Sequence, residues 1–202
     1  MLNFTKISLQ KKILFGSHIY MKQTNKCAAL LAMLALAIFA PVNQVRANDF
    51  QTMGDILQFA IPAYAFGLAW QEEGYKGTKQ FFYSLAASEL SVYVLKTTTH
   101  RPRPNYQEGD KKNSFPSGHT AAAFTGASFI HRRYGFKQAI IPYGLAIATG
   151  MSRIHAKKHH TWDVVAGAAI ACLWSWCFVE KKTNIVIDTD GEFTKIAYEV
   201  NF

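Results

Sequence analysis

The chain has 202 residues, of which 50% are hydrophobic and 17% are charged, whereas about 25% of the residues in an ordinary soluble domain are charged. This length allows one compact domain with a sizeable core. Residues 1–47 carry six of the 22 Lys and Arg residues and no acidic residue. The remaining 16 basic residues are nearly balanced by 13 acidic ones, so the net charge of +9 gives no support to nucleic-acid binding.

Residues 1–47 have the features of an export signal peptide. A short basic stretch precedes an apolar run at Cys27–Val42, and the small residues before position 48 form an acceptable cleavage site after Ala47. Met21 is an alternative start, because the preceding residues add nothing that a signal needs. Export would bring the protein to the bacterial cell envelope. An uncleaved membrane anchor is the alternative interpretation.

Residues 48–183 are predicted to form a helical domain. Five apolar segments are separated by polar loops, and they are rich in small residues, which let helices approach closely. We therefore expect an all-α fold, a bundle of about five to six helices. The segments cover residues 56–70, 81–95, 120–130, 139–151 and 164–179.

The lengths of these segments do not decide whether the helices cross a membrane. Crossing a bilayer takes about 20 consecutive apolar residues, whereas the uncharged runs Ile56–Gln71 and Val164–Val179 have 16 residues each. Runs of this length also suit the core helices of a soluble bundle. The low charge content favours membrane association, so we expect either an inner-membrane protein whose site faces the periplasm or a soluble periplasmic protein.

Residues 184–202 differ in character from the helical segments. Asn184–Asp188 and Phe193–Val200 are rich in β-forming residues, and Thr-Asp-Gly at 189–191 separates them. This pattern predicts a short C-terminal β-hairpin. It carries no residues that indicate chemistry.

Three basic residues are candidates for anion binding: Lys96 at the expected end of a helix, and Arg103 and Arg153 in the expected loops 97–115 and 152–162. A transferring phosphoryl group spreads negative charge over its oxygens, and preorganised donors that match this charge are usually the largest catalytic contribution. Arginine suits this role because its planar fork binds two oxygens at once. Together the three cations could clamp a phosphate, although each alone is more typical of a solvated surface charge.

Pro116-Ser117-Gly118-His119 is expected to begin a helix. Glycine lets the backbone approach an anion, and the first N–H groups of a helix lack internal partners and favour negative charge. The Ser117 hydroxyl and the Gly118 amide are therefore candidate phosphate donors. Ordinary helix caps use the same residue types.

Two histidines and one carboxylate complete the candidate site. His159 and Asp163 are four residues apart, which places them on one face if the segment is helical. If Asp163 accepts the Nδ1–H of His159, Nε2 remains free to attack phosphorus. His119 can then protonate the leaving group. A structural hydrogen bond or a helix cap is the alternative interpretation of the pair.

The three segments together resemble the type-2 phosphatidic acid phosphatase family, which shares its site with vanadium haloperoxidases and bacterial class A acid phosphatases. The family signature is Lys-x6-Arg-Pro, then Pro-Ser-Gly-His, then Ser-Arg-x5-His-x3-Asp. The resemblance spans roughly residues 53–180. The matching residues are Lys96-x6-Arg103-Pro104, Pro116-Ser117-Gly118-His119 and Ser152-Arg153-x5-His159-x3-Asp163.

The resemblance implies an α-helical core and metal-independent phosphate ester hydrolysis that needs no cofactor. It implies that His159 is the nucleophile that forms a phosphohistidine, that Asp163 orients it, and that His119 is the acid and then the base. The phosphate-binding positions that it implies are Lys96, Arg103, Ser117, Gly118 and Arg153.

Several alternatives remain at this point. The leading hypothesis is a phosphatase acting on a lipid phosphate or pyrophosphate; a soluble periplasmic acid phosphatase for small phosphoesters and a vanadate-dependent haloperoxidase are the others. His160 and Trp162 depart from the usual family pattern, which leaves the substrate preference open. His160 is also a second candidate nucleophile, but only His159 has the signature spacing to Asp163.

Overall fold

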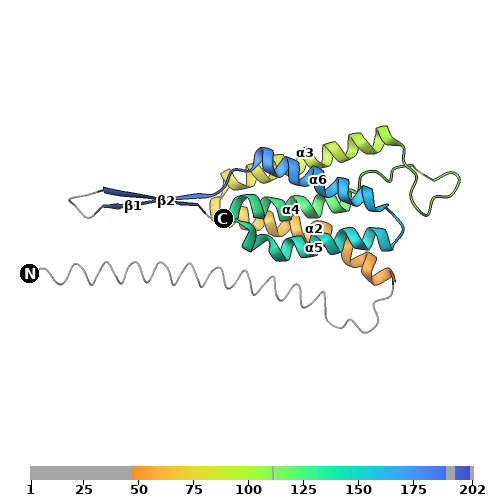
Figure 1. Cartoon of the computed structure of the whole chain (residues 1–202), viewed down its shortest axis with the longest axis horizontal. Helices are drawn as coiled ribbons and strands as arrows, with labels where there is room; N and C mark the ends of the chain where they lie inside the picture. The colour runs from red at the N-terminus through yellow and green to blue at the C-terminus, as the bar shows by residue number, and fades with distance from the viewer. Residues whose placement is uncertain (1–46, 111, 190–193, 201–202) are drawn as a thin grey trace, which may run out of the picture. The chain divides into compact units, whose positions relative to one another are not determined.

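The computed structural model describes residues 47–110, 112–189 and 194–200. Within this part of the chain lie five helices (Figure 1), so the predicted all-α bundle is confirmed. The predicted signal peptide falls outside the described residues, apart from Ala47. The helices are α2 (Ala47–Glu73), α3 (Tyr75–Thr99), α4 (Gly118–Tyr134), α5 (Phe136–His155) and α6 (Thr161–Phe178).

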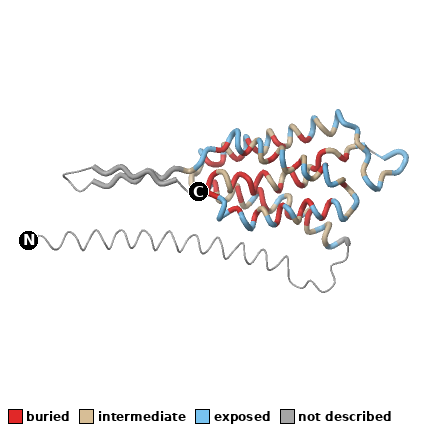
Figure 2. Tube along the Cα trace, in the orientation of Figure 1, coloured by how far each residue is buried: buried red, intermediate tan, exposed pale blue. Residues whose placement is uncertain are grey.

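Helix α4 is the central element of the bundle. It packs against α2, α3, α5 and α6, and Figure 2 shows buried positions along much of its length. Most of its residues are small or only moderately large, including an Ala121-Ala122-Ala123 run, and this allows four neighbours to surround it closely. The helix that begins with the Ser-Gly-His motif is therefore held on all sides.

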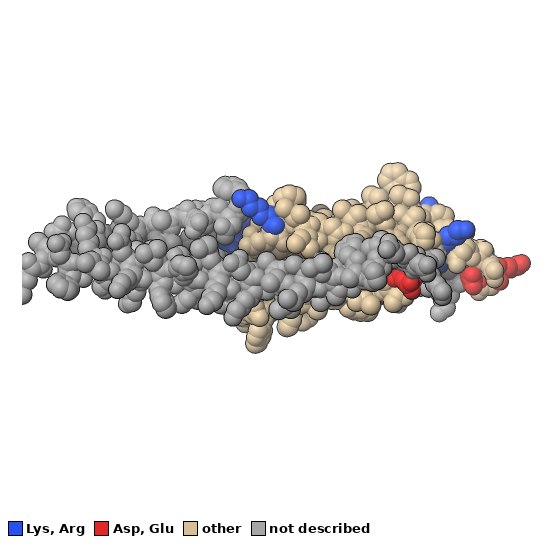
Figure 3. All heavy atoms as spheres, turned by 90° about the horizontal axis from the view of Figure 1, so that it is seen from below, with Lys and Arg blue, Asp and Glu red and all other residues tan. Residues whose placement is uncertain are grey.

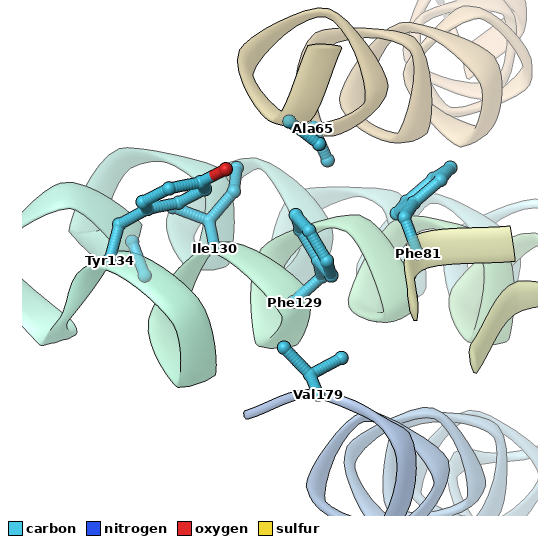
Figure 4. Close-up of a cluster of buried hydrophobic side chains, with 8 residues drawn as sticks. Ala65, Phe81, Phe129, Ile130, Tyr134 and Val179 are labelled. Carbon is cyan, nitrogen blue, oxygen red and sulfur yellow. The ribbon is translucent and has the colours of Figure 1, made fainter. Parts of the chain in front are cut away.

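A cluster of buried side chains lies toward the C-terminal end of α4, away from that motif. Figure 4 shows Phe129 between Phe81 of α3 and Val179, which follows α6. The rings of Phe81 and Phe129 meet edge to face with centroids 5.2 Å apart, an arrangement that aromatic pairs prefer. This cluster anchors one end of the bundle and leaves the other end for polar groups.

The outward faces of the other helices carry many exposed apolar side chains, whereas α4 contributes none of the large ones. On the face seen in Figure 3, the described surface is mostly uncharged in its middle, and the charged side chains gather toward its ends. Within the described residues, α6 is long and apolar enough to cross a membrane. Exposed examples are Phe59, Trp70, Phe82, Leu90, Tyr93, Ile140, Ile147, Leu173 and Trp176.

The tail forms a two-stranded antiparallel sheet where the sequence favours a hairpin. Strand β1 covers Thr183–Thr189 and β2 covers Thr194–Val200. Thr183 pairs with Val200 and Thr189 with Thr194.

Candidate active site

The predicted site residues gather at one end of the bundle. Helices α3 and α5 end there, and α4 and α6 begin there (Figure 1). Lys96 lies in the last turn of α3 and Arg153 in the last turn of α5, while Ser117 is the N-cap of α4. The three signature segments, far apart in the sequence, are therefore neighbours in space.

His159 is held by a backbone carbonyl rather than by the predicted carboxylate. Its Nδ1 lies 2.7 Å from the Ser114 carbonyl oxygen and 3.9 Å from Oδ2 of Asp163. A carbonyl only accepts, so Nδ1 carries the proton and Nε2 keeps its lone pair. The expected tautomer is present, but the direct Asp163 hydrogen bond is not, because His159 precedes α6 instead of lying on a helical turn.

Asp163 organises the loops around His159. It is fully buried and accepts hydrogen bonds from Arg101 Nη1 at 2.8 Å, Ser114 Oγ at 2.5 Å and the His160 backbone N–H at 2.8 Å. The last of these is the reciprocal half of a helix cap, in which an acidic side chain three residues into the helix binds the N-cap amide. Asp163 thus fixes Ser114, whose carbonyl in turn fixes His159.

His160 has different surroundings from His159. Its Nε2 lies 3.3 Å from the Pro102 carbonyl, in an exposed contact, whereas the side chain of His159 is 5% exposed. The two neighbouring histidines are therefore not interchangeable in this structure.

The N-terminus of α4 is brought close to α6. The Ser117 N–H donates to the Asp163 carbonyl at 2.9 Å, and Ser117 Oγ accepts from Thr120 Oγ1 at 2.9 Å. A Cβ on Gly167 would meet the Ser117 carbonyl oxygen at 2.5 Å, so α6 approaches this closely only because residue 167 is glycine. The start of α4 is thereby positioned beside the loop that carries His159.

Two of the predicted cations share one anchor. Lys96 Nζ donates to the Asn113 carbonyl at 3.0 Å, and Arg103 Nε donates to Asn113 Oδ1 at 3.2 Å. Burial, followed by the nearby charge of Arg103, lowers the pKa of Lys96 to about 8. The ammonium group therefore remains mostly protonated at neutral pH and close to a second positive charge, an arrangement suited to an anion.

Asp55, which the sequence analysis did not single out, joins the third cation to the second histidine. Its Oδ1 lies 2.6 Å from Arg153 Nη1 and 2.9 Å from His119 Nε2. Arg153 is 1% exposed and also donates to the Gln51 carbonyl. A Cβ on Gly54 would meet Arg153 Nη2 at 2.6 Å, so this glycine allows α2 to bring Asp55 into the site.

The two histidines experience different electrostatic environments. Burial, and then the charge of Lys96, lower the pKa of His159 to about 3, so His159 is neutral at physiological pH. Burial and then Arg153 also lower the pKa of His119, but Asp55 opposes that shift. One imidazole is thus kept unprotonated while the other has a carboxylate that favours its protonated form.

Two cavities adjoin these residues. A polar one of about 300 Å³ is lined by Arg103, Asn105, Tyr106, Asp110, Asn113 and Lys158. A more apolar one of about 390 Å³, here called the α2–α3–α4 cavity, is lined by Gln58, Phe59, Pro62, Leu85, Glu89, Gly118, His119 and Ala122. Within the described ranges, no cluster of three His, Cys, Asp or Glu side chains is arranged to hold a metal ion.

Asp55, Arg101 and Ser114 are the residues that sequence reasoning missed. The only signal for Asp55 was an isolated acidic residue at the start of an apolar segment, and its partners lie 64 and 98 positions away. The signature position is filled by Arg103, yet it is Arg101 that pairs with the buried Asp163.

The fold and this arrangement define a helical protein with a cation-rich anion site and two electrostatically distinct histidines. Residues 77–185 match the family model of the PAP2 superfamily. Lipid A 4'-phosphatase of Helicobacter pylori (strain J99) is 30% identical over 149 residues, covering 70% of this chain and 74% of that protein. The chain therefore belongs to the PAP2 superfamily and is a phosphatase, as its signature predicted.

A second relative and one solved structure also resemble this chain. Lipid A 1-phosphatase of Porphyromonas gingivalis is 32% identical over 170 residues, covering 76% of this chain but 37% of that longer protein. The crystal structure of Aquifex aeolicus LpxE has the same fold, with a TM-score of 0.57 at 24% identity over 72% of this chain and 92% of that one.

Proposed function

We propose that this protein hydrolyses a phosphate monoester or pyrophosphate of a lipid, without metal, through a phosphohistidine on His159. The observation that carries the proposal is the pairing of a neutral, buried His159 with the Lys96–Arg103 cation pair. Relatives named as lipid A phosphatases support a lipid substrate over a small soluble phosphoester or halide oxidation.

In the first step, Nε2 of His159 attacks phosphorus while the bond from phosphorus to the leaving oxygen breaks. His119 gives its proton to that oxygen, so the lipid departs as an alcohol from a monoester and as a monophosphate from a pyrophosphate. In the second step, His119 takes a proton from water, the water oxygen attacks phosphorus, and the P–N bond breaks to release inorganic phosphate. The positive charges of Lys96, Arg103 and Arg153 stabilise the non-bridging oxygens in both steps, together with the Ser117 hydroxyl and the Gly118 amide.

Asp55 acts as a positioning residue for the acid. Its carboxylate holds His119 Nε2 and offsets the positive charge of Arg153, both of which favour the protonated imidazole needed in the first step. A bound phosphate dianion also favours the protonated imidazole of His119, because it brings further negative charge beside Arg153. Asp163 positions His159 indirectly, through Ser114.

The protein is proposed to act at a membrane of the bacterial cell envelope. The large apolar side chains exposed on α2, α3, α5 and α6 support contact with lipid. Because the site lies at one end of the bundle, it would lie at the depth of the lipid headgroups, where the phosphate of a lipid substrate is. The predicted export signal would place this end of the bundle on the periplasmic side.

The test is phosphate release from lipid A, phosphatidic acid and p-nitrophenyl phosphate by the purified full chain in excess EDTA. We expect turnover of the lipids in preference to the small ester, near-complete loss in His159→Ala, and retention of most activity in the matched control His160→Ala. Undiminished turnover in His159→Ala would refute the mechanism. Faster turnover of the small ester than of either lipid would refute the proposed substrate class.

A further inference from the structure

Glu89, one of the residues that line the largely apolar α2–α3–α4 cavity, carries an unpaired polar atom. Oε1 of Glu89 is buried and has no hydrogen-bond partner among the described residues. Its neighbours along the wall include Phe59, Pro62 and Leu85. A buried acceptor without a partner is costly to a fold, and native structures rarely retain one without a reason.

The position of His119 identifies what this cavity would hold. A general acid must lie within about 2.6–3.2 Å of the oxygen that it protonates, and His119 lines the cavity together with Gly118. If His119 protonates the leaving oxygen, the atoms that follow this oxygen in the substrate lie in the space lined by His119. The attacking His159 and the Lys96–Arg103 cation pair are not among the lining residues.

The size of the cavity limits the occupant to one part of the substrate. Its volume of about 390 Å³ is near the lower end of the range of about 300–1,000 Å³ for small-molecule sites. It therefore accommodates the group next to the phosphate and not a whole lipid. Acyl chains would continue along exposed apolar side chains at its margin, of which Phe59 is 71% exposed.

We propose that the α2–α3–α4 cavity is the leaving-group subsite and that Glu89 accepts a hydrogen bond from a hydroxyl or amide N–H of the leaving group. This inference rests on the proposed function and sharpens its substrate class. An acylated amino sugar offers such donors close to its phosphate, whereas the carbons of diacylglycerol next to the phosphate carry only esters, which do not donate. Glu89 is thus a specificity-determining residue that favours phosphorylated acyl sugars over phosphatidic acid.

The test compares kcat/KM for lipid A and for phosphatidic acid in the full-length protein carrying Glu89→Met. Methionine nearly keeps the volume of the side chain and removes the acceptor, so we expect about a tenfold loss on lipid A and less than a twofold change on phosphatidic acid. Glu89→Gln retains a carbonyl acceptor and should restore most of the selectivity. Glu108→Gln, at an exposed position of the connector before α4, is the control with an unchanged ratio.

Thermal unfolding separates this role from a structural one. Replacing an unpaired buried acceptor by an apolar group of similar shape should leave Tm unchanged or raise it, whereas a structural role predicts a lower Tm. An equal loss on both substrates, or an unchanged ratio, in a variant that folds would overturn the proposal. Failure of the proposed function looks different, since then the wild-type protein releases phosphate from neither lipid or His159→Ala remains active.

Discussion

Replacing Asp55 by Asn tests whether the carboxylate of α2 takes part in catalysis. The substitution keeps the size of the side chain but removes the charge that contacts His119 Nε2 at 2.9 Å and Arg153 Nη1 at 2.6 Å. Asp55 lies before residues 77–185, which match the family model. Its contribution therefore rests on the contacts seen here and not on the family signature.

The expected effect is moderate in size and depends on pH. Hydrogen bonds to charged groups contribute about 1.5–3 kcal/mol. Because the Asp55 side chain is 40% exposed, solvent screening reduces this contribution to about 1–1.5 kcal/mol. Its loss would lower kcat about tenfold. Burial and then Arg153 already lower the pKa of His119, and Asp55 opposes that shift. Without Asp55 this pKa falls further, because nothing from Asp55 then offsets Arg153 and Lys158, both of which lower it.

The pH dependence of kcat on a short-chain phosphatidic acid is the measurement. His119 must be protonated to release the leaving group, so activity is present below its pKa and is lost as the pH rises through it. Asp55→Asn should therefore shift the alkaline limb to lower pH, with the smallest loss at acid pH. Glu108→Gln, an exposed acid-to-amide change, should leave the profile unchanged. A profile for Asp55→Asn with the wild-type shape and height, or one lowered equally at every pH, would refute the reasoning.

Three other predictions concern packing, the loop anchor and metal independence. Gly167→Ala should destabilise the fold by about 1–3 kcal/mol through overpacking, because its Cβ meets the Ser117 carbonyl at 2.5 Å. Gly67→Ala, inside α2 and with open space around its Cβ, should keep or raise the wild-type Tm, and equal melting of the two variants would contradict this. Arg101→Ala should lower kcat and Tm together, because it removes a 2.8 Å partner of the fully buried Asp163; a wild-type kcat would argue against the loop anchor. Phosphate release should persist in excess EDTA, and restoration of a lost activity by added divalent metal would show the mechanism to be wrong.

The helices were predictable because each apolar segment is long enough to form one and is bounded by polar loops. Lys96 and Ser117 lie at helix ends as expected, whereas Arg153, which was expected in the loop 152–162, lies in the last turn of α5. Their assigned roles in phosphate binding stay predictions. The sequence thus indicated which groups meet but not every contact among them.

The contacts that were missed depend on packing between distant segments. Asp55 reaches His119 and Arg153 only because α2 lies against both α4 and α5, and no spacing within the chain encodes this. The direct His159–Asp163 hydrogen bond was wrong for a local reason. Asp163 lies three residues past the N-cap of α6 and binds the His160 amide, so its oxygens are used by the cap, Ser114 and Arg101.

The central claim is that His159 forms a covalent bond to phosphorus. Rapid quenching of the full-length enzyme during turnover, followed by peptide mass spectrometry under alkaline conditions that preserve phosphohistidine, tests it most directly. The mechanism predicts phosphate on His159 in the wild-type protein and its accumulation in His119→Ala on a substrate with a good leaving group, because water attack then lacks its base. Phosphate on His160 instead, or the absence of any phosphorylated peptide while turnover is rapid, would contradict it.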